Sequence, residues 1–230
     1  MSAQTESEKK LAALEAVKYI RDGMTIGLGT GSTAFYAVGA IGDLVKQGMQ
    51  IKAVPTSVQT KQLARSLHIP LVEINEVNEI DITIDGADEF TTNFELIKGG
   101  GGALLREKVV ASLTKENITI ADSSKHVQKL GKFKLPVEVI PFAMNYVISQ
   151  LRGVGGEGVI RKKDNNIYMT DSKNYIIDVD FGLIGNPAKL ANELDHITGI
   201  VEHGLFINRT NRIIMAEEKT IHQFQNHKPG

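Results

Sequence analysis

The chain of 230 residues contains no cysteine. That absence excludes disulfide bonds, thiol nucleophiles and cysteine-ligated zinc or iron–sulfur centres. The six histidines are never spaced as HxH or HExxH, so they show no metal-ligand pattern. The sequence therefore predicts no metal site, and we interpret the histidines as surface or packing residues.

A charge excess of one sign is also missing. Lysine and arginine number 26 against 27 acidic residues, which leaves a net charge of −1 instead of the basic excess of a nucleic-acid binder. No apolar run reaches the length of a membrane span, about 18 residues. Residues 1–10 are polar and lack the apolar core of a signal peptide, so we expect a cytoplasmic location and neither nucleic acid nor membrane as a partner.

Short apolar runs alternate with amphipathic patterns in the first half of the chain. Repeated strand–helix units of this kind predict a parallel sheet with helices on both faces. Strands are expected at residues 24–28, 51–54, 71–74, 80–84 and 117–121, and helices at 7–20, 32–46, 58–67 and 103–113.

The pattern changes near Lys132, where a small α+β unit is predicted. The last strands, around residues 205–207 and 212–216, are expected to return to the first sheet. Within the small unit, strands are expected at 137–140, 159–163, 167–170 and 175–180, helices at 142–151 and 187–197, and a hairpin turn at 164–166.

The segment GLGTGST at residues 27–33 joins a predicted strand to a predicted helix. Glycines let the backbone approach an anion, and a helix N-terminus offers free N–H groups, so the segment predicts a phosphate site. The alternative is a tight structural turn. No lysine follows as in a P-loop, and residues 55–57 lack the acidic residue that would hold the ribose of NAD, which argues against a dinucleotide.

The segment DGADE at residues 85–89 follows the strand at 80–84. Carboxylates in such a loop accept hydrogen bonds from sugar hydroxyls, pass protons or bind a metal. A solvated acidic turn is the alternative, and Glu89 is interpreted as a surface charge or a salt-bridge partner.

The segment KGGGGALLREK at residues 98–108 contains four consecutive glycines, whose ordering costs much conformational entropy. Close approach of the backbone to a ligand would explain that cost; a flexible hinge is the alternative. Lys98 and Glu107 flank the glycines. A cation and a carboxylate in these positions are typical of an electrostatic stabiliser and a base. Glu107 is expected in the second turn of its helix. The segment ADSSK at residues 121–125 ends another strand, and by itself Lys125 is interpreted as a surface lysine.

Taken together, the four segments resemble the signature motifs of A-type ribose-5-phosphate isomerases, in the same order and at about the same spacing. The resemblance implies Glu107 as the catalytic base, with Asp85, Asp88 and Lys98 as further catalytic groups. It also implies a set of substrate-binding residues: Thr30, Gly31, Ser32, Thr33, Asp85, Gly86, Ala87, Asp88, Lys98, Gly99, Gly100, Gly101, Lys125 and Lys9.

The resemblance further implies an α/β fold, with a Rossmann-like catalytic domain at residues 1–131 plus 205–230 and a small α+β, ferredoxin-like domain at residues 132–204. The implied reaction interconverts D-ribose 5-phosphate and D-ribulose 5-phosphate through an enediolate, in the non-oxidative pentose phosphate pathway. It implies neither a cofactor nor a metal, a sugar phosphate as the small-molecule partner, and a homodimer or homotetramer.

Two rival functions fit the sequence less well. A glucosamine-6-phosphate deaminase would need a histidine near its acid–base carboxylates, and none lies in or beside residues 85–89 or 98–108. A sugar-phosphate sensor of a transcription regulator would carry a helix-turn-helix segment, yet only one short helix is expected before the sheet. It would also have no use for Glu107. A purely structural or interaction role ranks below both.

Overall fold

A computed structural model describes residues 3–226 of the chain. The chain divides into two compact units. Of the described residues, unit 1 comprises 3–87, 106–126 and 208–226, and unit 2 comprises 88–105 and 127–207. His227 and the ends of the predicted catalytic domain, residues 1–2 and 227–230, lie outside the described residues.

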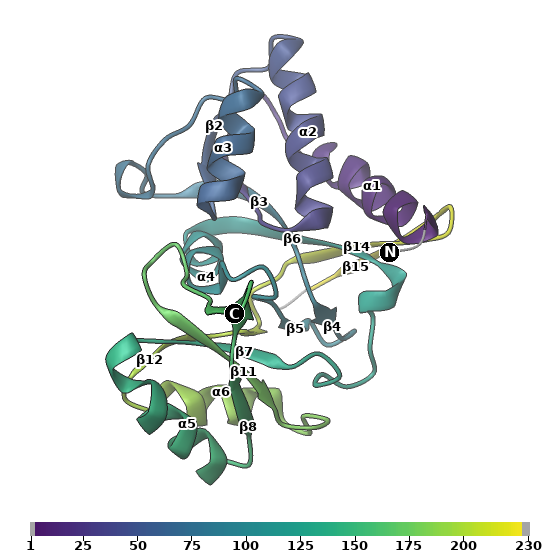
Figure 1. The fold of residues 1–230 in the computed structure, drawn as a ribbon. Helices are drawn as coiled ribbons and strands as arrows, with labels where there is room; N and C mark the ends of the chain where they lie inside the picture. Colours follow the sequence, from purple (N-terminus) through teal and green to yellow (C-terminus); the bar gives the residue numbers. More distant parts are fainter. Residues whose placement is uncertain (1–2, 227–230) are drawn as a thin grey trace. The chain divides into compact units, whose positions relative to one another are not determined.

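Within the described residues, unit 1 contains a six-stranded sheet in the order β15-β14-β6-β3-β1-β2 (Figure 1). All neighbouring strands are parallel except β14 and β15, which are antiparallel. The parallel strands follow the doubly wound order 2-1-3-4-5, whose winding reverses between β1 and β3, and ligands bind at the strand ends beside such a reversal. The strands are β1 (Thr25–Leu28), β2 (Lys52–Pro55), β3 (Ile80–Gly86), β6 (Thr114–Asp122), β14 (Arg212–Glu217) and β15 (Thr220–Gln225).

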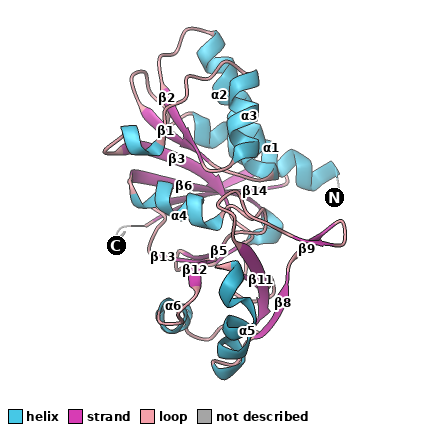
Figure 2. Ribbon diagram, turned by 60° about the vertical axis from the view of Figure 1, so that its left-hand side comes forward, coloured by secondary structure: helices cyan, strands magenta, loops and turns pink. Residues whose placement is uncertain are grey.

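Helices cover both faces of this sheet, as the sequence predicts (Figure 2). Ala13, Val38 and Ala64, from α1, α2 and α3, belong to one apolar core with the sheet. Val110 of α4 packs with Val54 in a separate cluster. The helices are α1 (Ala3–Val17), α2 (Ser32–Lys46), α3 (Val58–Ser66) and α4 (Leu104–Ser112), with short 3₁₀ turns η1 (Ile74–Glu76) and η2 (Ser123–Lys125).

The main sheet of unit 2 has four antiparallel strands in the order β12-β7-β11-β8. With α5 and α6 the chain order is β-α-β-β-α-β, which is the ferredoxin-like arrangement that the family resemblance implies. Apolar side chains of both helices share a core with β7 and β11. The elements are β7 (Leu135–Val139), η3 (Pro141–Ala143), α5 (Met144–Gly153), β8 (Glu157–Ile160), β11 (Tyr175–Asp180), α6 (Pro187–Asp195) and β12 (Ile200–His203).

A hairpin and a small sheet complete unit 2. The hairpin joins β9 (Lys162–Lys163) to β10 (Asn166–Ile167), and Asp164 and Asn165 at its tip have φ angles of 51° and 64°. Paired positive φ angles suit a two-residue hairpin, so the predicted turn is confirmed. The small sheet is antiparallel in the order β13-β5-β4, with β4 (Glu89–Phe90), β5 (Glu95–Ile97) and β13 (Leu205–Ile207).

Two strand predictions are wrong. Residues 71–74 form a single bridge at Leu71 and then turn into η1, because Glu73 and Glu76 cap each other's backbone N–H groups. Residues 205–207 do not return to the first sheet but pair with β5, whose three residues are too short to stand out in the sequence. The strand at 212–216 does return and pairs with β6.

The predicted small domain covers residues 132–204. Unit 2 contains these residues and, in addition, 88–105, 127–131 and 205–207. In the described part of the chain, no helix is both long and apolar enough to cross a membrane.

Candidate active site

The carboxylate of Asp85 ties together the ends of β1 and β3, where the winding of the sheet reverses. Its Oδ1 accepts hydrogen bonds from the N–H groups of Thr30 at 3.0 Å and Gly86 at 2.7 Å. A Cβ atom on Gly29 would lie 2.2 Å from the same oxygen, so only glycine fits there. The first two glycine motifs of the sequence therefore meet at the expected edge of the sheet.

Two threonines, Thr56 after β2 and Thr60 on α3, hold the first glycine loop. Thr30 Oγ1 lies 2.7 Å from Thr56 Oγ1 and 3.2 Å from Thr60 Oγ1. Thr60 Oγ1 also donates to the carbonyl of Gly29 at 3.0 Å. The sequence alone did not identify Thr56 and Thr60 as supports of this loop. A signal for them was available, because the polar segment that contains them directly follows β2, as the other candidate loops follow their strands.

The N-terminus of α2 opens onto a cavity of about 470 Å³. Gly31 precedes the helix with a φ of 105° and, like Ser32, is exposed, whereas Thr33 is buried. Because Gly31 has no side chain to cap α2, the first N–H groups of that helix are available to an anion. The cavity is lined on this side by Gly31 and Ser32 and elsewhere by aromatic and polar side chains, including Tyr36 and Glu6.

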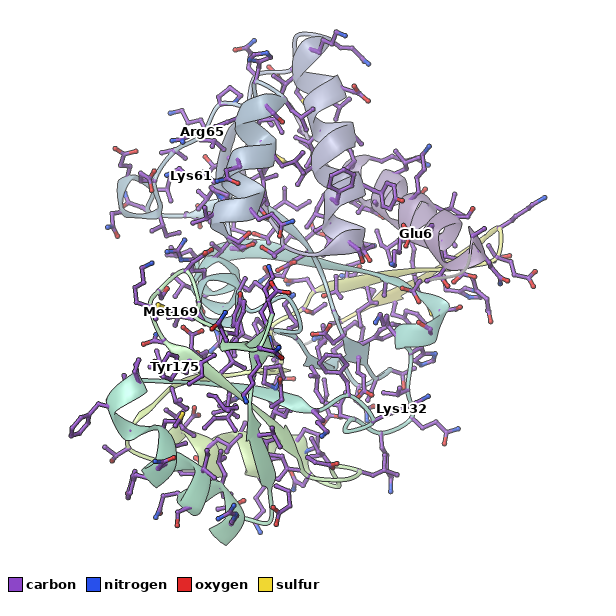
Figure 3. All side chains as sticks on the ribbon, in the orientation of Figure 1. Glu6, Lys61, Arg65, Lys132, Met169 and Tyr175 are labelled. Carbon is purple, nitrogen blue, oxygen red and sulfur yellow. The ribbon has the colours of Figure 1, made fainter. Side chains whose placement is uncertain are left out.

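Lys9 is buried on α1, where its Nζ lies 2.8 Å from Glu6 Oε1. Tyr36 donates a hydrogen bond of 2.7 Å to Glu6 Oε2. The hydrogen bonds from Lys9 and then Tyr36 lower the pKa of Glu6, so this carboxylate stays charged at neutral pH. Figure 3 labels Glu6 on α1. Lys9 thus belongs to a side-chain network that reaches the cavity beside the first glycine loop.

Lys125 ends η2 and is half-buried. The turn that carries it is held by Glu8, a buried residue of α1. Glu8 Oε2 accepts from Ser123 N–H at 3.1 Å and Oγ at 2.8 Å, and Oε1 accepts from the N–H of Glu218 at 2.9 Å. Burial raises the pKa of Glu8, but the hydrogen bonds from Glu218 and Ser123 outweigh it, so the pKa is lowered.

The four-glycine segment of unit 2 contacts the carboxylate of Asp88 through Gly100. Gly100 N–H donates to Asp88 Oδ2 at 2.7 Å, and a Cβ on Gly100 would lie 2.5 Å from Oδ1. Gly99 and Gly102 have φ angles of 100° and 80°, which favour glycine, and Gly100 and Gly101 are exposed. Lys98 is buried, with its Nζ 5.3 Å from the ring centre of Phe206.

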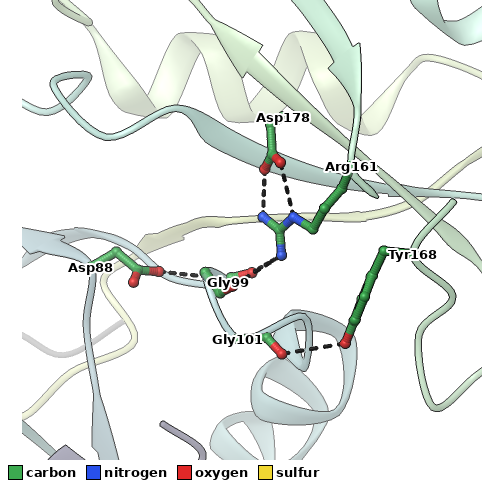
Figure 4. A network of polar contacts seen from close by, with 7 residues as sticks. Asp88, Gly99, Gly101, Arg161, Tyr168 and Asp178 are labelled. Atoms are coloured by element: carbon green, nitrogen blue, oxygen red, sulfur yellow. Dashed lines mark hydrogen bonds and ion pairs between the residues drawn. The ribbon is translucent and has the colours of Figure 1, made fainter. Parts of the chain in front are cut away.

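The carbonyl groups of this segment are held by side chains of the β8–β11 region (Figure 4). Arg161 Nη1 donates to the carbonyls of Gly99 at 2.9 Å and Gly100 at 3.1 Å. The Tyr168 hydroxyl lies 3.4 Å from the carbonyl of Gly101. The guanidinium is itself paired with Asp178, whose Oδ2 accepts from Nε at 2.9 Å. None of these three side chains was identified from the sequence.

Glu107 is 4% exposed and lies in the first turn of α4 instead of the second, because the helix begins at Leu104, one residue later than predicted. A carboxylate in the first turn of a helix is favoured by the helix dipole. The backbone N–H of Leu105 at the start of α4 is hydrogen-bonded to Glu138. Burial raises the pKa of Glu138, although hydrogen bonds from Asn174 and Thr170 partly offset the effect.

Glu89 is not the surface charge that the sequence suggests. It is 3% exposed, and its two oxygens accept hydrogen bonds from the N–H groups of Gly131 at 2.8 Å and Phe133 at 2.6 Å. Glu89 therefore supports the chain that leads into β7.

The structure brings the predicted site residues together in two sets. In unit 1, the loop of Thr30, Gly31, Ser32 and Thr33 contacts Asp85 and Gly86 through the Thr30–Asp85 bond. In unit 2, Asp88 contacts the loop of Lys98, Gly99, Gly100 and Gly101. Ala87 is half-buried, and the chain passes between the units after it and again after Leu105, inside the sequence motifs themselves. Among the described residues, no three histidine, aspartate or glutamate side chains gather as metal ligands would.

These features define an α/β protein with glycine-rich loops at the carboxyl ends of its parallel strands. Residues 52–220 match the family described as ribose 5-phosphate isomerase A (phosphoriboisomerase A). Ribose-5-phosphate isomerase A of Streptococcus gordonii is 52% identical over 212 residues, which cover 92% of this chain and 94% of that protein. The chain belongs to the ribose-5-phosphate isomerase A family.

Two solved structures support the same assignment. The ribose 5-phosphate isomerase A of Methanocaldococcus jannaschii matches with a TM-score of 0.92 and 41% identity, over 96% of this chain and all of that one (100%). A D-ribose-5-phosphate isomerase in complex with phospho-erythronic acid matches with a TM-score of 0.94 and 37% identity, over 98% of this chain and 100% of that one. The family resemblance and the α/β fold predicted from the sequence are confirmed.

Proposed function

We propose that this chain interconverts D-ribose 5-phosphate and D-ribulose 5-phosphate by proton transfer through an enediolate, as part of the non-oxidative pentose phosphate pathway. The observation that carries the proposal is the buried carboxylate of Glu107, which follows the exposed glycine segment along the chain. A carboxylate shielded from water is a suitable general base, and free backbone N–H groups are suitable donors to a developing oxyanion.

The phosphate end of the substrate binds the first glycine loop. Thr30, Gly31, Ser32 and Thr33 supply backbone N–H groups and hydroxyls at the N-terminus of α2, where an anion is favoured by the helix dipole. Lys9 and Lys125 add positive charge at the phosphate end. Neutral donors fix the position of the phosphate, and the lysines raise the attraction at longer range.

The sugar end carries the chemistry. The furanose ring must open first, with Asp85 or Lys98 assisting the proton transfer at the ring oxygen. Glu107 then removes the proton from C2 and returns it to C1. Lys98 and the N–H groups of the glycine segment stabilise the enediolate, and Asp88 or Asp85 moves the proton between O1 and O2. Gly86, Ala87, Gly99, Gly100 and Gly101 line the path of the substrate. A glutamate base with an electrophilic partner is also the arrangement by which triosephosphate isomerase carries out its proton transfers.

The remaining proposals concern the state of the enzyme. It acts in the cytoplasm, as a homodimer or homotetramer, without a cofactor or a metal. Light scattering coupled to gel filtration distinguishes the two oligomeric states.

A coupled assay of ribulose 5-phosphate formation from ribose 5-phosphate in EDTA buffer tests the function. We expect turnover in the range of ordinary enzymes, about 1–1000 s⁻¹, and no loss with chelator. Tight binding of ribose 5-phosphate without turnover would favour the sugar-phosphate sensor, and absence of both would refute the proposal.

A further inference from the structure

Arg161 occupies the junction between β8 and β9, at a place where its backbone is fixed on both sides. Its N–H donates to the carbonyl of Ile176 at 2.8 Å, and its own carbonyl accepts from Tyr168 N–H at 2.9 Å. Ile176 belongs to β11, and Asp178 lies two residues after it on the same strand. Arg161, which follows β8, is therefore a diagonal neighbour of Asp178. The backbone hydrogen bonds therefore fix the Cα of Arg161 independently of the contacts that its guanidinium makes.

The guanidinium bridges a carboxylate and two peptide carbonyls. Nε and Nη2 both pair with Asp178, and Nη1 reaches the carbonyls of Gly99 and Gly100. The side chain is 14% exposed, and the Tyr168 ring lies 5.9 Å from its central carbon. A planar guanidinium with several fixed donors can make these contacts together, whereas a lysine ammonium cannot reproduce the same fork.

The direction of the two carbonyls determines where the opposite N–H groups point. No cis peptide bond occurs in the described residues, and in a trans peptide the C=O and the next N–H point in opposite directions. The carbonyl of Gly99 points to Arg161, and the N–H of Gly100 accordingly points away from it, to Asp88 Oδ2 at 2.7 Å (Figure 4). The carbonyl of Gly100 also points to Arg161, so the N–H of the exposed Gly101 points away in the same manner.

We propose that Arg161 is a positioning residue for the isomerase reaction. It holds the carbonyls of Gly99 and Gly100 so that the N–H of Gly100 orients Asp88 and the N–H of Gly101 is presented to the substrate oxygen that becomes negative in the enediolate. Asp178 keeps the guanidinium in place. This inference rests on the proposed function and adds a residue that itself does not contact the substrate.

Arg161→Lys tests the role because it keeps the charge and removes the fork. We expect kcat to fall about 30–100-fold with KM within about threefold, since a misplaced donor of about 1 Å costs on the order of 100-fold in rate. Affinity for phospho-erythronic acid, whose carboxylate resembles the enediolate oxygen, should fall with kcat/KM. Arg152→Lys is the matched control, because Arg152 is an exposed arginine of the same unit and should leave both values unchanged.

Asp178→Asn is the second variant, in case Arg161→Lys folds poorly. It retains the guanidinium but weakens its anchor, and we expect a smaller loss in kcat, about tenfold. Hydrogen–deuterium exchange of the peptide covering residues 98–105 gives a readout independent of turnover and should be faster in both variants.

The inference would be overturned if folded variants kept kcat and analogue affinity within about twofold of wild type, or if exchange of that peptide did not change. A loss of activity that merely followed a loss of folded protein would also contradict it, because analogue affinity per folded molecule would then be normal. Absence of turnover in the wild type would count against the isomerase assignment instead, since exchange reports on the Arg161 contact whether or not the chain is an isomerase.

Discussion

The first glycine loop, residues 29–33, and the glycine segment at residues 99–102 are both exposed in part, but they are held by different chemistry. The first rests on threonine hydroxyls and one carboxylate, Asp85, and a helix N-terminus remains open beside it. The second lies between a guanidinium on its carbonyl side and the carboxylate of Asp88 on its N–H side. The difference suits two tasks: a phosphate needs a fixed cradle, whereas a developing oxyanion needs donors of defined direction.

The two loops also use glycine for different reasons. At Gly100 a side chain would collide with Asp88, while at Gly31 there is open space around a missing Cβ and the backbone conformation is the obstacle, with φ 105° and ψ 176°. That conformation is essentially restricted to glycine. Substitutions to alanine should therefore affect rate in one loop and binding in the other.

Of the substitutions that compare the two loops, Gly100→Ala should have the largest effect. The new methyl group must displace the Asp88 carboxylate from its hydrogen bond, so we expect kcat to fall about 100-fold with little change in melting temperature. Gly153→Ala in the same unit is the control, because a Cβ there meets no atom within 4 Å. Steady-state kinetics and thermal melting check both; a normal kcat for Gly100→Ala would show that Asp88 need not stay where it is.

Gly31→Ala should raise KM about tenfold and change kcat little, because a backbone strain of about 1–3 kcal/mol disfavours the phosphate-binding conformation. Gly39→Ala is the matched control on the same helix, since it has open space and a helical backbone. The comparison of the loops would fail if Gly31→Ala lowered kcat as much as Gly100→Ala does while leaving KM unchanged.

The smallest expected effect is on thermal stability. It concerns two buried carboxylates whose pKa values are shifted in opposite directions, Glu8 in unit 1 and Glu138 in unit 2. The lowered pKa of Glu8 means that its stabilisation is present above the unfolded pKa, near 4.5, and is lost as the pH falls through the folded pKa. The raised pKa of Glu138 means the reverse: its contribution is full below the unfolded pKa and is lost as the pH rises through the folded value.

Glu8→Gln should therefore lower the melting temperature by about 2–6 °C at pH 7 and by less at pH 4. Glu138→Gln should lower it more at pH 4 than at pH 8. Melting curves at these pH values test both, and equal losses at all pH values would mean that neither charge contributes in the stated direction.

Local patterns in the sequence predict the helices and the parallel strands of unit 1 well. The range of α2 agrees at both ends, because its apolar period lies between Gly31 and Gly48, whose positive φ angles interrupt a helix. In unit 2 the sequence predicts both helices of the ferredoxin-like arrangement and the strands β7, β8 and β11, but not the fourth strand, β12. The motif resemblance to the isomerase family is confirmed by the relatives.

Features that depend on distant partners were not predictable. The strands β4 and β5 are too short to be recognised alone, and the predicted strand at residues 205–207, which is β13, pairs with β5 instead of the first sheet. Arg161 appears in the sequence beside Lys162 and Lys163 as one more surface charge. The register between β8 and β11 brings Arg161 next to Asp178. The fold of unit 2 brings it to the carbonyls of Gly99 and Gly100, which lie about 60 residues earlier in the chain. The assigned roles of the individual site residues stay predictions.

The most direct test of the proposed reaction is the turnover of Glu107→Gln, with Glu79→Gln as an exposed glutamate control in the same unit. We predict that the Glu107 variant loses about 1000-fold or more in kcat while its dissociation constant for ribose 5-phosphate stays within about threefold of wild type, because glutamine fills the same space but cannot take the C2 proton. Turnover within about tenfold of wild type would contradict the assignment of Glu107 as the base.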